Sequence, residues 1–563
     1  MRLAKAQFSS SKTIRSDLHP NADTISACAC GPKVSLTAKT SGPSLRVRPL
    51  RYNRELIQQE PESSRLFSEP PAGSVARFAN RKVTVLMKNI TRRQFGQGVA
   101  ATAAALALPK LALSQLRSVS REFPKGFLWG CATAAYQIEG GAKDDGRGPS
   151  VWDTFSHTPG ITVNGDTGDV ADDSYHRYKE DIQLLKNLGV ATYRMSISWS
   201  RVFPNGTGQP NAKGLDYYNR VVDELLANKI TPYITLFHWD LPQALPGGWQ
   251  SRDTAKAFAD YAAYVTKHIG DKVHHWMTTN EFVCFTDLGY MQGTFAPGLK
   301  LPAAQANQVR HHGILAHGLG VQAIRANTPS GTQVGLAENT NVYVPVIETK
   351  EHIEAARKAT RDGAAMFLAP VMEGKYAASY LEREGANAPK VEPGDMAAIG
   401  SKLDFVGLNV YTADYVEADG SAQGYAIAPR PTSYPHMTSP WIQISPECTY
   451  WTIRNVSELW HPPAIFITEN GCSSDDVPNA AGKIEDTDRV MYLRNHIANV
   501  QRAAAEGYPI KGYFLWSLLD NFEWRDGYSK RFGIHYVDFK TQKRTPKLSA
   551  EWYRDTIARN TVE

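Results

Sequence analysis

The sequence predicts a single α/β domain, a (β/α)8 or TIM barrel spanning residues 115–563, and three observations support this. From about Arg121 onward, strand-like and helix-like segments alternate, which favours a parallel sheet covered by helices. Eight strand segments can be proposed, which is the number in such a barrel. Polar side chains recur at the ends of these strands, where a barrel gathers them at one face. A barrel with insertions also absorbs much of a chain of 563 residues.

The predicted strands and helices follow one another along this domain. The strands cover residues 127–138, 192–198, 231–238, 274–280, 334–340, 405–410, 464–468 and 512–517. Between the first two strands, residues 175–189 carry apolar side chains at helical spacing, and Gly189 stands where a helix C-cap is expected. Further helices are predicted over residues 217–227, 255–269, 305–326, 351–367 and 487–506.

Residues 1–86 are predicted to lie outside the domain, as a disordered or non-native extension. They are rich in Ser, Pro and Arg and lack sustained helical or strand periodicity. They hold 14 Lys and Arg against 6 Asp and Glu, so the net charge of +6 leaves −2 for residues 87–563. The globular part is thus nearly neutral, and no Lys/Arg-dense stripe appears in it, which argues against a nucleic-acid partner.

Residues 87–114 resemble a twin-arginine export signal. Arg92 and Arg93 precede Phe95 at the expected offset, and an Ala-rich run follows that is too short to span a bilayer. The alternative is a chance Arg-Arg pair beside a buried helix. Because such a signal stands at an N-terminus, we hypothesise that translation begins at Met87. We expect a periplasmic or secreted protein with no stable membrane anchor.

The residues after the signal predict neither a metal site nor a disulfide framework. The four cysteines are widely scattered, so free thiols are expected, with a single bridge as the alternative. Metal-dependent barrel enzymes use three or more converging Asp, Glu or His ligands, and the strand ends offer no convincing set. No metal and no cofactor is therefore expected. The cysteines are Cys131, Cys284, Cys448 and Cys472.

Polar and aromatic side chains stand at seven of the eight predicted strand ends. Taken singly, each is more often packed core or a solvated carboxylate than a functional group. Taken together, Glu281 and Glu469 follow the fourth and seventh strands and are flanked by aromatics and amides rather than further carboxylates. Glycoside cleavage requires such a pair. The remaining members are Gln137, Arg194, His238, Trp239, Asn280, Asn409, Tyr411, Trp516, Glu523 and Trp524.

Five motifs occur in order between Arg121 and Tyr553. They are FLWGCATAAYQIE (127–139), YRMSISWSR (193–201), TLFHWDLP (235–242), ITENG (467–471) and WSLLDNFEW (516–524). Together they resemble the family 1 glycoside hydrolases. The resemblance implies a retaining β-glucosidase that releases terminal non-reducing β-D-glucosyl residues by double displacement, from β-glucosides or from short oligosaccharides such as those of cellulose degradation.

The resemblance also implies a role for each residue of the strand-end set. Glu469 is implied as the nucleophile and Glu281 as the general acid/base, with Arg194 and Tyr411 supporting the nucleophile. Asn280 is implied to bind the sugar 2-hydroxyl, and Trp516 to form an apolar floor. The implied substrate-binding residues are Gln137, His238, Trp239, Asn280, Asn409, Trp516, Glu523 and Trp524.

The sequence departs from the family pattern beside the acid/base. It reads Thr278-Thr-Asn-Glu-Phe282 where Thr-Phe-Asn-Glu-Pro is usual, and Asn409-Val-Tyr411 where Asn-Tyr-Tyr is usual. Both carboxylates are kept, so hydrolysis is still expected. We expect Phe282 to alter either the choice of leaving group or the setting of the acid/base.

Three other functions are open to a sequence of this kind. A 6-phospho-β-glycosidase would need cations near the eighth strand; an ionised Glu523 argues against it, and Lys530 and Arg531 are interpreted as solvated loop charges. A transglycosidase would share every catalytic residue. A non-catalytic sugar-binding barrel would lack one carboxylate, and both are present. The preference among glucose, galactose and fucose, and the oligomeric state, do not follow from the sequence.

Overall fold

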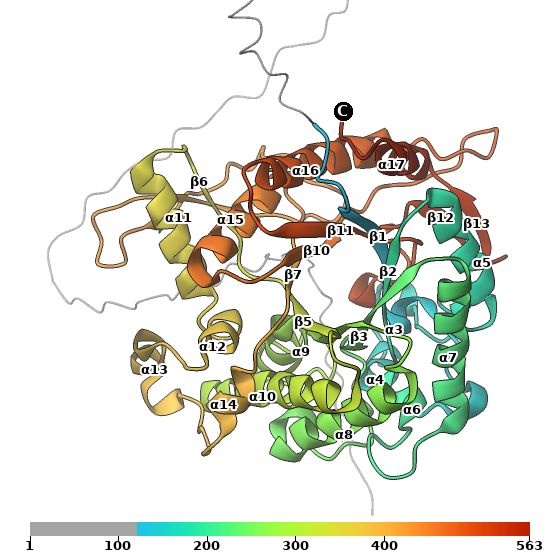
Figure 1. Cartoon of the computed structure of the whole chain (residues 1–563), viewed down its shortest axis with the longest axis horizontal. Helices are drawn as coiled ribbons and strands as arrows, with labels where there is room; N and C mark the ends of the chain where they lie inside the picture. The colour runs from blue at the N-terminus through green and yellow to red at the C-terminus, as the bar shows by residue number, and fades with distance from the viewer. Residues whose placement is uncertain (1–120) are drawn as a thin grey trace, which may run out of the picture. The chain divides into compact units, whose positions relative to one another are not determined.

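The computed structural model describes residues 121–563, and the predicted extension and export signal lie outside this range. Eight parallel strands form a closed barrel (Figure 1), which confirms the predicted fold class. Each strand pairs with the next around the barrel, and β11 closes the sheet against β1. In chain order the strands are β1 (Leu128–Ala132), β2 (Thr192–Ser196), β3 (Thr231–Phe237), β4 (His275–Asn280), β5 (Gln333–Glu338), β7 (Val406–Asn409), β10 (Ile465–Asn470) and β11 (Ile510–Trp516).

The first predicted strand was too long. It ends at Ala132, where its pairing with β2 stops, and helix α3 (Ala135–Ile138) begins shortly after. The backbone N–H of Ala135 donates to the Ser196 hydroxyl at 2.7 Å, so the first residue of α3 bonds to a side chain of β2 instead of continuing the strand ladder. The apolar run over residues 131–135 fits a strand equally well, and this tertiary contact decides between the two.

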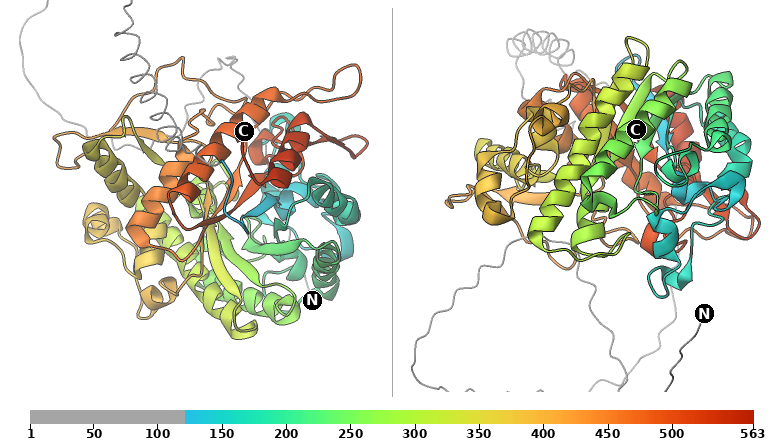
Figure 2. Two further views of the ribbon diagram at one scale, coloured as in Figure 1. Left: turned by 45° about the horizontal axis from the view of Figure 1, so that its top comes forward. Right: turned by 90° about the horizontal axis from the view of Figure 1, so that it is seen from below.

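Helices surround the barrel, and α8 and α10 pack side by side along one flank (Figure 2). The six predicted helices are all present, although α11 ends at Gly363 rather than at residue 367. Two of the longer helices, α15 (Cys448–Trp460) and α17 (Leu548–Arg559), were not predicted. Most of α15 is buried, so it lacks the polar stripe that marks a surface helix. The longer helices are α5 (Ser174–Leu188), α7 (Ala212–Ala227), α8 (Arg252–Ile269), α10 (Ala303–Asn327), α11 (Lys350–Gly363), α15 (Cys448–Trp460), α16 (Thr487–Ala505) and α17 (Leu548–Arg559).

Short helices and two small sheets occupy the connections. The helices are α4 (Val151–Ser156), α6 (Trp199–Val202), α9 (Phe282–Thr286), α12 (Leu368–Glu373), α13 (Ala378–Glu384) and α14 (Asp395–Ile399). The sheets are β6 (Tyr343–Pro345) with β8 (Asp414–Glu417) and β9 (Ala426–Ile427), and β12 (His535–Asp538) with β13 (Lys543–Pro546). Helix α5 ends as predicted, because Gly189 adopts a left-handed conformation with φ 75° that lets the chain turn.

Aromatic side chains fill the interior of the barrel. Tyr233 of β3 lies 5.1 Å from the ring of Phe514 on β11 and 5.6 Å from that of Phe466 on β10. These strands are not neighbours of β3, so the three rings meet inside the barrel rather than along its wall. They form the floor beneath the carboxyl ends of the strands.

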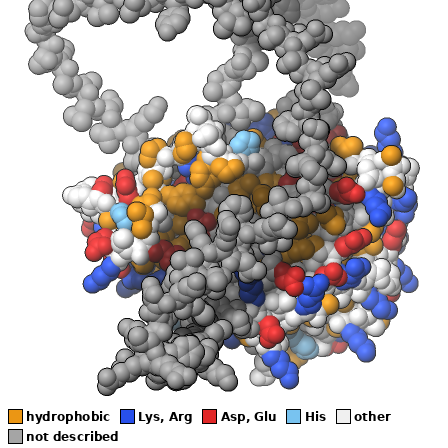
Figure 3. Space-filling model, turned by 90° about the horizontal axis from the view of Figure 1, so that it is seen from above, with side chains coloured by type: hydrophobic (Ala, Val, Ile, Leu, Met, Phe, Trp, Pro, Cys, Tyr) orange, Lys and Arg blue, Asp and Glu red, His pale blue; other side chains and the backbone are white. Residues whose placement is uncertain are grey.

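On the face shown in Figure 3, hydrophobic side chains are visible near the centre, and acidic and basic side chains are interspersed around them. Within residues 121–563, no helix combines the length and the apolar character needed to cross a membrane.

Candidate active site

The structure brings the predicted strand-end residues together at the carboxyl end of the barrel. Glu281 directly follows β4, Glu469 is the second-last residue of β10, and Tyr411 lies two residues beyond β7. Arg194 differs from the prediction in one respect, because it stands in the middle of β2 rather than at its end. Its long side chain, which is fully buried, still reaches the site.

Both oxygens of the Glu469 carboxylate are held by donors. Arg194 Nη1 donates to Oε1 at 2.5 Å, and the Tyr411 hydroxyl donates to Oε2 at 2.7 Å. The guanidinium is itself anchored, since its Nε donates to the Thr235 hydroxyl and its Nη1 also reaches the Thr468 carbonyl. A fixed positive charge and two hydrogen bonds therefore hold both carboxylate oxygens of Glu469 in place.

Glu281 has a different environment. Its Oε1 accepts from Asn409 Nδ2 at 2.7 Å, and its Oε2 accepts from the Cys284 thiol at 3.1 Å. Burial raises the pKa of Glu281 to about 7, and the negative charge of Glu469 contributes in the same direction. Glu281 thus keeps its proton near neutral pH and can act as an acid.

Asn280 connects the two carboxyl groups. Its Oδ1 accepts from Arg194 Nη2 at 2.6 Å and from Asn409 Nδ2 at 2.9 Å, and its Nδ2 lies 3.2 Å from His238 Nε2. Arg194 and Asn409 in turn contact Glu469 and Glu281, respectively. The polar network therefore fixes both carboxyl groups relative to each other.

Two buried polar atoms of the predicted sugar-binding set have no hydrogen-bond partner among the described residues. They are Oε1 of Gln137 and Nδ1 of His238. Burial lowers the pKa of His238 well below its usual value, so the imidazole is neutral. Buried polar atoms are normally satisfied, and a ligand with several hydroxyl groups would supply the missing partners.

The surroundings of Glu523 work against the ionised form expected from the sequence. Burial raises its pKa well above the usual value, and the charges of Asp526, Glu469 and Glu281 contribute in the same direction. Its Oε2 accepts from Gln137 Nε2 at 3.4 Å. The accumulation of carboxyl groups, rather than Glu523 alone, makes the site unfavourable for an anionic ligand.

Three tryptophans and His238 form an aromatic wall. The His238 ring stacks on Trp516 at 5.9 Å and on Trp524 at 6.0 Å, and Trp239 lies 4.4 Å from Trp524. The indole N–H of Trp239 donates to the Asn280 carbonyl at 2.9 Å, so Trp239 offers the site its ring surface rather than its donor. Aromatic faces of this kind suit the C–H surfaces of a sugar ring.

Backbone strain is concentrated in the same place. Glu281, Trp239 and Trp524 all adopt positive φ, at 50°, 75° and 48°. Bulky residues are uncommon in this region of backbone space, and such conformations persist only where the surroundings enforce them.

The sequence reasoning missed a third carboxyl group and a thiol beside the acid/base. Glu338 is the last residue of β5, the one predicted strand from which no site residue was chosen, and its carboxyl accepts from the backbone N–H of Phe282 at 3.0 Å. This contradicts the expectation that no further carboxylate flanks the pair. Cys284 lies three residues after Glu281, one helical turn away, and that spacing was the available signal.

Phe282 itself points into the core. Its side chain is fully buried, and its ring stacks on that of Phe367 at 5.5 Å. The expectation that Phe282 alters the setting of the acid/base is therefore the one that its contacts favour.

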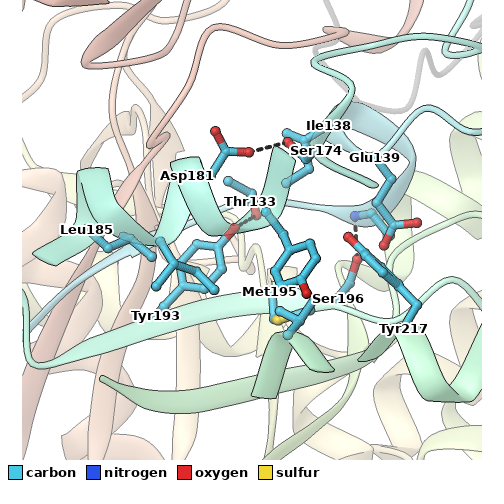
Figure 4. A pocket seen from close by; sticks show the side chains of 14 residues that line it. Thr133, Ile138, Glu139, Ser174, Asp181, Leu185, Tyr193, Met195, Ser196 and Tyr217 are labelled. Atoms are coloured by element: carbon cyan, nitrogen blue, oxygen red, sulfur yellow. Dashed lines mark hydrogen bonds between the residues drawn. The ribbon is translucent and has the colours of Figure 1, made fainter. Parts of the chain in front are cut away.

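A small pocket among the described residues is separate from this site. It measures about 30 Å³ and lies between β2, α3, α5 and α7 (Figure 4), where the Ser174 hydroxyl donates to Asp181 and the hydroxyls of Thr133 and Tyr193 share a hydrogen bond. None of the predicted site residues lines it, and its volume suits about one water molecule. The four described cysteines are free and buried, and no group of three or more His, Cys, Asp or Glu within residues 121–563 could hold a metal ion.

A closed (β/α)8 barrel with two buried glutamates at its strand ends, one beside an arginine and the other with a raised pKa, defines the class of glycoside hydrolases. Comparison with known proteins agrees. The model of glycosyl hydrolase family 1 matches residues 119–562, and the chain belongs to this family.

Its relatives are similar over nearly their whole length. The 1,4-beta-D-glucan glucohydrolase of Thermotoga neapolitana is 45% identical over 443 residues, which cover 78% of this chain and 99% of that protein. Beta-glucosidase A of Thermotoga maritima is also 45% identical, over 79% of this chain and 99% of its own. The structure of a family 1 β-glucosidase from Thermotoga maritima in complex with glucoimidazole superposes with a TM-score of 0.73 at 44% identity, covering 78% of this chain and 100% of that one.

Proposed function

We propose that this chain is an exported β-glucosidase that releases terminal β-D-glucosyl residues from short β-glucosides, including cello-oligosaccharides. One observation carries the mechanism: the two buried glutamates have opposite electrostatic settings, with Arg194 against Glu469 and a raised pKa at Glu281. The relative named 1,4-beta-D-glucan glucohydrolase supports β-1,4-linked glucans as the substrate class.

In the first step, Glu469 attacks the anomeric carbon while Glu281 transfers its proton to the glycosidic oxygen. The bond between carbon and oxygen breaks, the leaving group departs as an alcohol, and the sugar becomes an ester of Glu469. Tyr411 and Arg194 hold both oxygens of the nucleophile, so the attacking atom is positioned before the substrate binds.

In the second step, Glu281 acts as a base. Once Glu469 is esterified, its negative charge no longer raises the pKa of Glu281, so Glu281 ionises more readily. It can then take a proton from the water that attacks the anomeric carbon and releases glucose with retained configuration.

A 6-phospho-β-glucoside is the less favoured substrate. Neither nearby cation is free: Lys530 donates to the Thr438 carbonyl at 2.7 Å, and Arg531 pairs with the buried Asp520 at 2.6 Å. Both are half-buried, which corrects their interpretation as solvated loop charges. The carboxyl groups around Glu523 also disfavour a phosphate.

The test compares two variants that differ only in which carboxylate is lost. On an activated aryl β-glucoside, Glu469→Gly with azide should form α-glucosyl azide, because azide takes the place of the nucleophile. Glu281→Gly with azide should form β-glucosyl azide, because azide then attacks the glucosyl enzyme. The same anomer from both variants, or turnover of only the 6-phospho substrate by the wild-type enzyme, would contradict the proposal.

Export can be tested separately from catalysis. Residues 87–120 joined to a reporter that functions only outside the cytoplasm should direct export through the twin-arginine route, and Arg92→Lys with Arg93→Lys should abolish it. Undiminished export of the doubly substituted fusion would refute a twin-arginine signal.

A further inference from the structure

Two successive backbone N–H groups at the acid/base are both held by the end of β5. The N–H of Glu281 donates to the Ala337 carbonyl at 2.9 Å, and the N–H of Phe282 donates to Glu338 Oε2 at 3.0 Å. Glu281 lies between these two anchors in a left-handed conformation, with φ 50° and ψ 87°. The backbone that carries the acid/base is thus fixed on both sides of its Cα atom.

The second anchor is a buried carboxyl group that the mechanism of hydrolysis does not use. Glu338 is 2% exposed, and burial raises its pKa to about 8, with the charges of Glu281 and Asp287 contributing in the same direction. A neutral glutamic acid can accept a hydrogen bond from the N–H of Phe282 through one oxygen, and it adds no negative charge beside Glu281 to that of Glu469.

The hydrogen-bond donor to Glu338, the backbone N–H of residue 282, also depends on the residue at this position. Phe282 stands where the family pattern has proline, and proline has no N–H to donate. A proline at this position would leave the buried carboxyl of Glu338 without this donor, and an apolar residue at 338 would leave the N–H without its acceptor. The two residues therefore form a matched pair.

We propose that Glu338 is a positioning residue for the acid/base, which it holds in its strained conformation through the backbone N–H of Phe282. This inference rests on the proposed role of Glu281. The side chain of Glu281 is oriented separately by Asn409 and Cys284, so loss of the backbone anchor should displace the carboxyl group without removing it.

The experiment measures kcat/KM on two β-glucosides, because this constant reports the step in which the leaving group departs. An alkyl β-glucoside needs the proton from Glu281, whereas a 2,4-dinitrophenyl β-glucoside does not. Glu338→Leu should lower kcat/KM for the alkyl substrate about 10- to 100-fold, the cost of misplacing a catalytic group by about 1 Å. The dinitrophenyl substrate should change by less than about threefold, since it does not depend on the displaced proton.

Conservative and compensating variants complete the design. Glu338→Gln keeps an oxygen that accepts the N–H and should retain most of the activity on both substrates. Phe282→Pro should reproduce the selective loss, and Phe282→Leu, which keeps the N–H, measures what removal of the ring costs. The double variant Phe282→Pro with Glu338→Leu removes both partners together, so its loss should be smaller than the product of the two single losses.

Equal losses on both substrates in Glu338→Leu would mean general damage to the fold and would overturn the inference. Losses that multiply in the double variant would overturn it as well. If Glu338→Leu does not fold, Phe282→Pro against Phe282→Leu provides the same comparison. Wild-type enzyme that hydrolyses neither substrate would instead refute the proposed function.

Discussion

Raising the pH from 6 to 8 should lower kcat/KM for an alkyl β-glucoside about tenfold, because Glu281 loses its proton over this interval. With a pKa of about 7, the protonated fraction falls from about 0.9 to about 0.1. An unperturbed glutamate, with a pKa near 4.5, would already be ionised across the whole range. The pH at which kcat/KM declines therefore measures how far burial and the charge of Glu469 raise the pKa of Glu281.

The assay is the pH profile of kcat/KM between pH 5 and pH 9 at constant ionic strength. A 2,4-dinitrophenyl β-glucoside provides the control, because its departure needs no proton and its kcat/KM should fall much less above pH 7. An alkaline limb near pH 5 would refute the reasoning about burial. An equal decline for both substrates would show that a group other than the acid is titrating.

Three further predictions follow from the contacts around the two carboxyl groups. Tyr411→Phe removes a hydroxyl that donates to Glu469 at 2.7 Å. A hydrogen bond to a charged group contributes about 1.5–3 kcal/mol, so kcat should fall about 10- to 100-fold in steady-state assays. An unchanged kcat would exclude a role of Tyr411 in supporting the nucleophile. Cys284→Ala removes a hydrogen bond that lowers the pKa of Glu281. The alkaline limb of the kcat/KM profile should therefore move to higher pH. A movement of this limb to lower pH would contradict the contact between Cys284 and Glu281. Glu281→Gln should raise Tm at pH 8 but not at pH 4. The raised pKa of Glu281 gives the folded protein a stability that is complete below pH 4.5 and is lost as the pH rises through about 7, when the buried carboxyl group ionises. Equal changes in Tm at both pH values in thermal melts would argue against this linkage.

The barrel was predictable because its signals are local. Alternating strand and helix patterns located all eight barrel strands, and the strand-end rule selected Glu281 and Glu469 from a chain with many carboxylates. The same rule failed at β5, where Glu338 was passed over. It also failed at Arg194, which reaches the site from the middle of β2 because its side chain is long.

Protonation states were not predictable from the residue types. Glu523 was expected to be ionised, and its surroundings instead raise its pKa through burial and through three other carboxyl groups. Asp526 lies three residues from Glu523, but Glu469 and Glu281 come from distant parts of the sequence, so the combined effect appears only when the chain is folded.

The sequence by itself determined the fold class, the pair of glutamates at the strand ends and the departure at Phe282, because periodicity, motif spacing and residue identity can all be read along one dimension. Only the tertiary structure decided what the departure does. Phe282 and Glu338 lie 56 residues apart and meet because β4 and β5 are neighbours in the barrel. Hydrogen bonding and desolvation depend on such neighbours in space, and no local pattern in the sequence records them.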